Sequence, residues 1–189
     1  SEVTHASRGI YAGLVRNSGI ISANSVVRGA DGRIVLKASG GVQLEAGNSV
    51  TANGSSGGRI VVDAGQGAAV AAGNLEATGS AGSGGSIAVT GARAGILDGS
   101  RIDASGASAG GSVMIGGDLH GAPIRNGELA LPSSQLTYVA KDAQIRADAL
   151  DSGDGGKVVV WSDGATAYYG AISARGGARG GNGRSVEVS

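Results

Sequence analysis

The sequence predicts an all-β protein: a right-handed single-stranded parallel β-helix with three short strands per coil. The first reason is a recurring unit, seen clearly in residues 56–64, in which two glycines precede a short alternation of apolar and polar side chains. The second is its spacing. Measured on the first apolar residue of each copy, the steps are 26, 27, 26, 45 and 28 residues, from Ile34, Ile60, Ile87, Val113, Val158 and Val186. A fixed period with one insertion indicates a repeat fold of about 26 residues per coil.

Composition is the third reason. There are 38 glycines but only 2 prolines and no Gly-X-Y register, which excludes collagen, and 41% of residues are hydrophobic, which a flexible Gly/Ser linker does not need. Aromatic residues make up 3% and phenylalanine is absent, so the interior must be narrow enough for small aliphatic side chains. The formal net charge is zero and no like-charged run occurs, so we expect neither a nucleic-acid partner nor membrane insertion.

Each period contains three strand-like pieces separated by turns, for example residues 60–64, 68–72 and 75–78. The third piece has its own signature: an aliphatic residue, a polar one, alanine, and another polar one. It occurs at residues 21–24, 50–53, 75–78, 102–105, 145–148 and 172–175. Such short strands, without a helix-length segment between them, fit a coiled chain in which each strand pairs with its equivalent one period later. Right-handedness follows the rule for parallel crossovers.

Alternation assigns the faces of the first strand in each coil. The inward residues are predicted to be Ile34, Leu36, Ala38, Ile60, Val62, Ala64, Ile87, Val89, Val113, Ile115, Val158, Val160, Val186 and Val188. The outward residues are predicted to be Arg33, Lys37, Arg59, Asp63, Thr90, Lys157 and Glu187. Residues 94–98 do not keep a clean parity, and we expect a β-bulge there.

The step of 45 residues places an extrahelical loop insertion at residues 117–135, which contains both prolines and His120. Such a loop leaves the coil and lies over one face, where function is often carried. The sequence stops in mid-coil after Val188, so we expect residues 1–189 to be a single β-helix fragment of a longer solenoid.

The amino-acid sequence of residues 145–149, 153–164 and 170–177 resembles that of the large exoproteins of the filamentous-haemagglutinin type. These proteins are bacterial adhesins that are exported by two-partner secretion. The resemblance is strongest over residues 116–189. It implies a β-helical shaft that is secreted to the cell surface through an outer-membrane transporter barrel and supports attachment to host cells or in a biofilm. The sequence contains no Asn-Pro dipeptide, which those proteins usually carry near the start of the secretion domain, so shaft is the favoured assignment.

An alternative is a segment of a carbohydrate-active β-helix, a polysaccharide lyase or hydrolase, with its catalytic coils outside this fragment. Such enzymes need clustered carboxylates, whereas Asp63, Asp103 and Glu187 are predicted on different coils and faces. Asp148, Asp151 and Asp154 are read as turn residues, and His5 and His120 have no cysteine to complete a metal site. We therefore expect no catalysis, no cofactor and no metal.

Four residues form a candidate sugar contact. Counting from inward Val158 and Val160 places Trp161 outside. The resemblance to the related adhesins, which carry an aromatic residue at the position of Tyr168 and a polar one at that of Tyr169, implies that Tyr168 lies inside and Tyr169 outside. An exposed indole and phenol can stack on a sugar ring, while Lys157 and Asp163 bond its hydroxyls. The competing interpretation is that the insertion folds back over Trp161 and hides it. Any ligand would be a host or biofilm glycan or a surface receptor.

Overall fold

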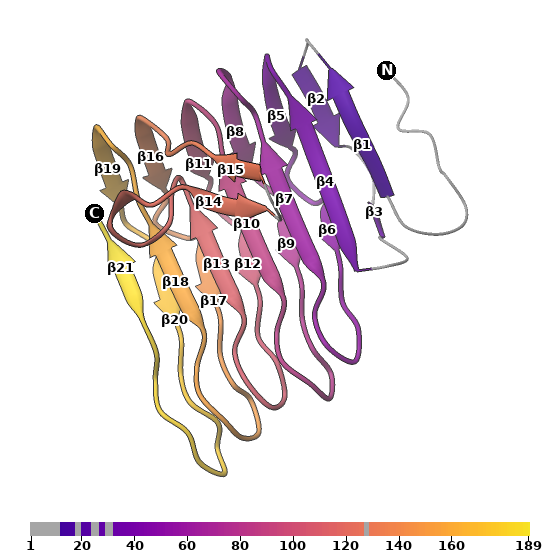
Figure 1. Cartoon of the computed structure of the whole chain (residues 1–189), viewed down its shortest axis with the longest axis vertical. Helices are drawn as coiled ribbons and strands as arrows, with labels where there is room; N and C mark the ends of the chain where they lie inside the picture. Colours follow the sequence, from indigo (N-terminus) through magenta and orange to yellow (C-terminus); the bar gives the residue numbers. More distant parts are fainter. Residues whose placement is uncertain (1–11, 18–19, 24–26, 29–31, 127–128) are drawn as a thin grey trace.

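The chain winds into a solenoid in which each coil contributes one strand to each of three parallel sheets (Figure 1). The computed structural model describes residues 12–17, 20–23, 27–28, 32–126 and 129–189. This architecture confirms the predicted parallel β-helix with three short strands per coil. Within the described residues, no helix is long and apolar enough to cross a membrane.

All three sheets are built from strands in parallel register. The first sheet has the order β1 (Ala12–Asn17), β4 (Arg33–Ala38), β7 (Arg59–Asp63), β10 (Ser86–Thr90), β13 (Ser112–Ile115), β18 (Lys157–Val160) and β21 (Val186–Val188). The second has the order β2 (Ile20–Ala23), β5 (Gly41–Leu44), β8 (Ala68–Ala71), β11 (Arg93–Ile96), β16 (Leu136–Val139) and β19 (Ala165–Tyr168). The third has the order β3 (Val27–Arg28), β6 (Ser49–Thr51), β9 (Asn74–Glu76), β12 (Arg101–Asp103), β17 (Gln144–Arg146) and β20 (Ala171–Ser173).

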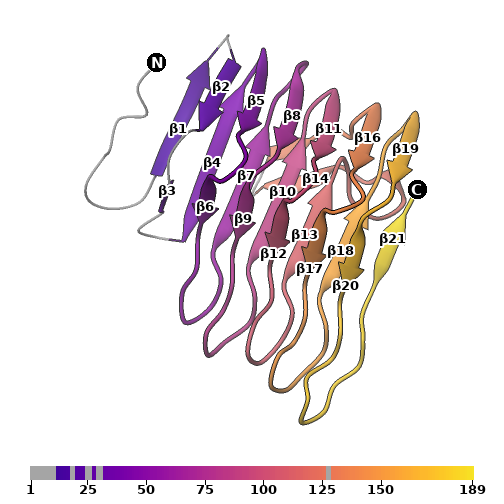
Figure 2. The ribbon, with the colours of Figure 1, turned by 180° about the vertical axis from the view of Figure 1, so that it is seen from behind.

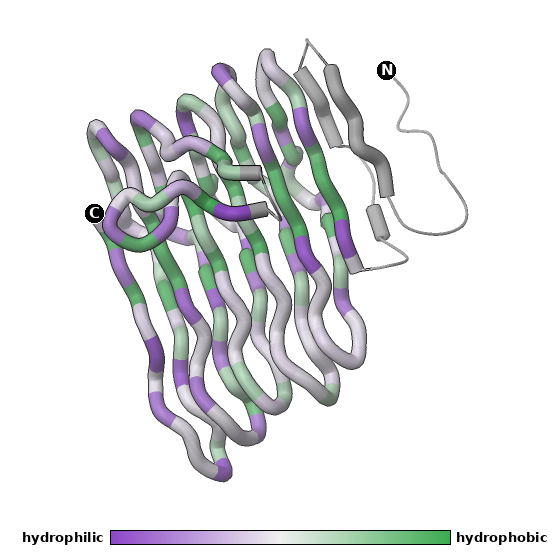
Figure 3. Tube along the Cα trace, viewed as in Figure 1, coloured by the Kyte–Doolittle hydropathy of each residue, from purple (hydrophilic) through white to green (hydrophobic). Residues whose placement is uncertain are grey.

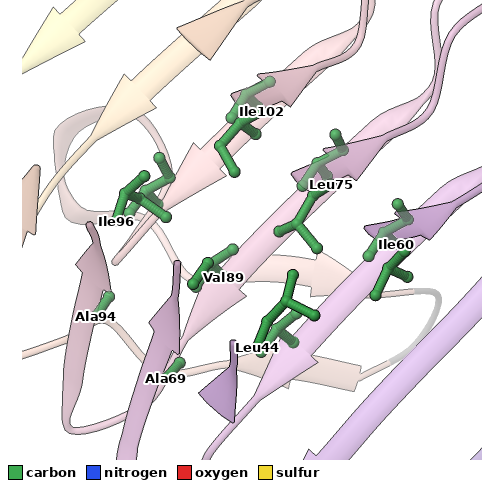
Figure 4. Close-up of a cluster of buried hydrophobic side chains, with 14 of the residues drawn as sticks. Leu44, Ile60, Ala69, Leu75, Val89, Ala94, Ile96 and Ile102 are labelled. Atoms are coloured by element: carbon green, nitrogen blue, oxygen red, sulfur yellow. The ribbon is translucent and has the colours of Figure 1, made fainter. Parts of the chain in front are cut away.

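The core is a narrow column of stacked aliphatic side chains between the three sheets (Figure 4). Ile34, Ile60 and Ile87 are paired in register and fully buried, as the alternation predicts. Val186 and Val188 keep the same register but are 48% and 41% exposed. They are less buried than predicted because β21 is the edge strand of its sheet.

Glycine is abundant because the loops after the third strand form a thin layer without a side-chain core. These loops, here called the wing, comprise residues 53–57, 78–84, 105–110, 148–155 and 175–184, and extend below the sheets in Figure 1. Bridges between Gly54, Gly79 and Gly106 join the wing from coil to coil. A Cβ on Gly79 would lie well inside 3.0 Å of the Ser83 carbonyl oxygen, so the outgoing and returning arms meet backbone to backbone. Figure 3 shows the resulting contrast, with a mostly pale wing and green first-sheet strands.

Two local expectations are wrong. Residues 21–23 belong to β2, which pairs with β5 in the second sheet, and Val27–Arg28 supplies the third sheet in that coil. The bulge expected at residues 94–98 is not seen within β11, which pairs residue for residue with β8 and β16 from Arg93 to Ile96. Gly95 takes an outward position there and keeps the alternation intact.

Candidate functional site

The segment 117–135 lies across the outer face of the first sheet, and we call it the strap. It leaves the coil after β13, forms the antiparallel hairpin of β14 (Ile124–Asn126) and β15 (Leu129–Leu131), and rejoins at β16. Figure 1 shows this hairpin in front of the first sheet. Ile124 and Leu131 are 0% and 4% exposed and form a second hydrophobic cluster.

Beneath the hairpin is a row of outward apolar residues at one register position of the first sheet. Val61, Ala88 and Met114 are buried here although they point away from the core column. Their strands therefore read as apolar triplets rather than as a strict alternation. Parallel strands covered on both faces characteristically show continuous apolar runs. That pattern is the signal from which the covered outer face could have been found.

Two residues that were predicted to point outward, Thr90 and Asp63, are nevertheless buried. Thr90 is fully buried because its hydroxyl donates to the Pro132 carbonyl oxygen at 2.8 Å. Asp63 is 4% exposed because it pairs with Lys37 at 2.7 Å and accepts a hydrogen bond from the Gly65 N–H. Both side chains point outward but are held by partners on that face.

Two charged contacts fasten the first half of the strap to strands that come later in the chain. Asp118 accepts from the Lys157 ammonium on β18 at 2.6 Å, with both side chains partly buried. The His120 N–H donates to the Glu187 carboxylate on β21 at 3.3 Å, and the imidazole Nδ1 lies 3.5 Å from the same carboxylate. The strap thus links the fourth, fifth and sixth strands of the first sheet with the last one.

Trp161 follows β18 and is half-buried beneath the strap. A Cβ on Gly117 or Gly121 would lie against the indole ring, which shows how closely the strap passes over it. The indole Nε1 donates to the Asp163 carboxylate at 2.9 Å. Three of the four candidate sugar-contact residues, Lys157, Trp161 and Asp163, are therefore on the strap side, each with a protein partner.

Tyr169 lies elsewhere. It follows β19, the strand that begins just after Asp163 and runs away from it for about 13 Å. Tyr169 is 63% exposed, and its ring lies next to that of Tyr138, with centroids 6.1 Å apart and planes tilted by 59°. The structure thus does not gather the four residues around one point. Tyr168 packs against the core as predicted, and burial raises the pKa of its phenol.

Asp148 lies in the turn after β17, where its carboxylate accepts hydrogen bonds from residues of the next coil. Burial would raise the pKa of its carboxyl, but hydrogen bonds from the Arg175 N–H, the Ser173 hydroxyl and the Arg175 guanidinium outweigh burial and hold the pKa below its ordinary value. The carboxylate ties two neighbouring coils together at the start of the wing. No cluster of three or more potential metal-ligating side chains is found in the described part of the chain.

No protein-family model and no curated protein matches the sequence. Among solved structures, the fold is similar to that of the HMW1 secretion domain from Haemophilus influenzae, with a TM-score of 0.71 at 20% sequence identity. The match covers 90% of this chain and 49% of that one, so this chain spans about half the length of its structural neighbour. The chain therefore has the β-helical fold of a bacterial secretion domain.

Proposed function

We propose that this chain is a non-catalytic shaft segment of a secreted bacterial adhesin of the filamentous-haemagglutinin type. The observation that carries the proposal is the parallel solenoid, in which successive coils pair strand by strand along one axis. Such a rod, filled by stacked aliphatic side chains, holds its outer faces away from an anchoring surface. The resemblance of residues 145–177 to these adhesins, and the fold shared with a secretion domain, support the same assignment.

The proposed partner during export is an outer-membrane transporter barrel of two-partner secretion. A chain without cysteine suits this route, because no disulfide can form before the unfolded chain crosses the outer membrane. The absence of an Asn-Pro dipeptide supports a shaft rather than the part of the protein that engages the transporter. Attachment to host cells or within a biofilm is the proposed outcome of display at the surface.

A glycan contact through Trp161, Tyr169, Lys157 and Asp163 stays a prediction. The strap's contacts with Trp161 and Lys157 favour the alternative in which these two residues pack the strap. Glycan-array binding of the parent and of Trp161→Ala separates the two interpretations. Loss of signal in the variant supports the sugar contact, whereas an equal signal, or none from either protein, removes it.

The export proposal is tested on intact bacteria that carry the natural gene. An antibody against this chain should label unpermeabilised cells, and deletion of the gene for the cognate transporter should abolish the label while leaving the protein detectable in lysed cells. Labelling that persists without the transporter, or that appears only after permeabilisation in the wild type, refutes the proposal. Adhesion to epithelial cells and to plastic, measured on the same strains, tests the adhesive role separately.

A further inference from the structure

The outer face of the second sheet is almost entirely apolar over its last four strands, and we call this part the apolar face; the preceding strand, β5, is followed by Glu45 and carries Gln43 outward. It consists of the outward positions of β8, β11, β16 and β19 and the residue after each strand. These positions are Ala68, Val70, Ala72, Arg93, Gly95, Leu97, Leu136, Tyr138, Ala140, Ala165, Ala167 and Tyr169. Arg93 is the only charged residue among them. The four strands lie side by side in Figure 2.

Large side chains on this face are open to solvent. Leu136, Tyr138 and Tyr169 are 49%, 42% and 63% exposed, and Leu97 is 36% exposed. The other two sheets differ: the hairpin covers the first, and the third carries polar residues such as Gln144 and Arg146 outward. A contiguous apolar patch of this kind on a soluble surface marks an interaction site.

We propose that the apolar face pairs with the same face of a second copy of this chain, with the two solenoids side by side and parallel. Such an isologous pair has two-fold symmetry, so each residue faces the residue related to it by the axis. An axis parallel to the solenoid places β11 of one copy over β11 of the other, running in opposite directions. This inference rests on the composition of the apolar face and does not depend on the proposed function.

Charge selects this arrangement over the alternative. Arg93 lies where β11 begins, and Asp98 lies just beyond its end, and both are exposed. With the facing strands antiparallel, Arg93 of one copy meets Asp98 of the second copy. The other two-fold axis, parallel to the strands through the centre of the apolar face, would place β11 over β16 and Arg93 opposite Leu136, without a charged partner. Complementary charges at the rim of an interface fix its orientation more than its affinity.

Side-chain sizes are complementary in the same arrangement. Tyr169 of one copy faces Ala165 of the other, because these two positions lie at opposite ends of β19. Gly95 and Tyr138 lie in the middle row, next to the axis. From the strand spacing and rise, the face measures roughly 300 Å² per copy, less than half that of a standard interface. The pair is therefore weak and forms in a concentration-dependent manner.

Sedimentation velocity over a range of protein concentrations tests the association. The average mass of the parent should rise toward twice that of one chain, and Tyr138→Lys should weaken the association by at least about tenfold, because it places a charge beside the axis. The matched control is Gln144→Lys on the outer face of the third sheet, which should behave like the parent. Arg93→Glu should weaken the pair, and the double variant Arg93→Glu with Asp98→Arg should restore it.

Cross-linking tests the position of the axis. The chain contains no cysteine, and the nearest atom to a Cβ added at Gly95 is a methyl group of Val70 at 4.0 Å, so Gly95→Cys fits without distortion. Because packed sheets lie about 10 Å apart, too far for a direct disulfide, a short bis-maleimide reagent should cross-link dimers of Gly95→Cys and far fewer of Gln144→Cys. A parent protein that remains monomeric at every concentration overturns the proposal. Binding of glycans or vesicles by that monomer would not rescue it. A dimer that Tyr138→Lys leaves unchanged overturns it equally.

Discussion

Gly85→Ala should destabilise the protein strongly although it adds only one methyl group. Gly85 is the second glycine of the pair that opens β10. Its N–H donates to the Ala77 carbonyl at 2.7 Å, and the next N–H, of Ser86, donates to the Gly58 carbonyl at 2.9 Å. A Cβ at Gly85 would fall well inside 3.0 Å of that Gly58 oxygen, so the two coils must move apart.

The cost follows from what this movement disrupts. Losing two backbone hydrogen bonds costs about 1 kcal/mol each, and forcing a methyl group into a packed site adds about 1–3 kcal/mol. The free energy of unfolding should therefore fall by about 3–5 kcal/mol. For a chain of this size, that lowers Tm by about 10 °C. Gly95→Ala is the matched control, because a Cβ there meets nothing closer than 4.0 Å.

The control should be stabilised by about 0.5 kcal/mol, since alanine loses less backbone entropy than glycine in a strand. Thermal unfolding of both variants and the parent, followed by far-UV circular dichroism, measures the difference. Equal Tm values for Gly85→Ala and Gly95→Ala would show that the coils do not approach each other at the glycine pairs. The backbone contact proposed as the reason for the glycine content would then be wrong.

Three further changes test other parts of the structure. Val62→Asp buries an unpaired carboxylate in the core column and should lower the free energy of unfolding by several kcal/mol, measured by urea unfolding. Leu131→Asp should release the hairpin from the first sheet, and the fluorescence of Trp161, the only tryptophan, should shift to longer wavelength while far-UV circular dichroism is retained; an unchanged spectrum contradicts the packing of the strap on the indole. Asp148 has a lowered pKa in the folded state, so the stability it contributes is present near neutral pH and is lost as the pH falls through that pKa, below about pH 4. Asp148→Asn should flatten that acid-dependent loss of Tm, and an identical pH profile would show that the carboxylate contributes nothing.

The coil repeat could be predicted from the sequence because each coil needs a small aliphatic side chain at the same positions, where it stacks on the coils before and after it. Ile34, Ile60 and Ile87 occupy one position of the core column, and each can be replaced only by a side chain of similar size. The alternation around them therefore survives in the sequence. The prediction was wrong near Ile21, which was assigned to the third strand of its coil but belongs to the second sheet. An aliphatic-polar-alanine segment fits either sheet.

The outer contacts could not be predicted in the same way. The strap belongs to one coil only, so no repeat reports what it covers, and its partners Lys157 and Glu187 lie far away in sequence. The apolar character of Val61 and Met114 was the available signal that the outer face of the first sheet is buried. Tyr169 was placed outside correctly, but its neighbour Tyr138 is one coil earlier and could be identified only from the register of β16 and β19.

The most direct test of a shaft made of equivalent coils is to remove one coil from the natural protein. Deleting residues 34–59 joins Arg33 to Ile60, which reproduces the Arg59-Ile60 junction and removes 26 residues, one full period, at a distance from Trp161 and the strap's charged contacts. The variant should still be displayed on the bacterial surface and should retain adhesion, because the remaining coils can pair in register. Deleting only residues 34–46, half a coil, should abolish both. Loss of display in the whole-coil variant, or normal display in the half-coil variant, would contradict the shaft.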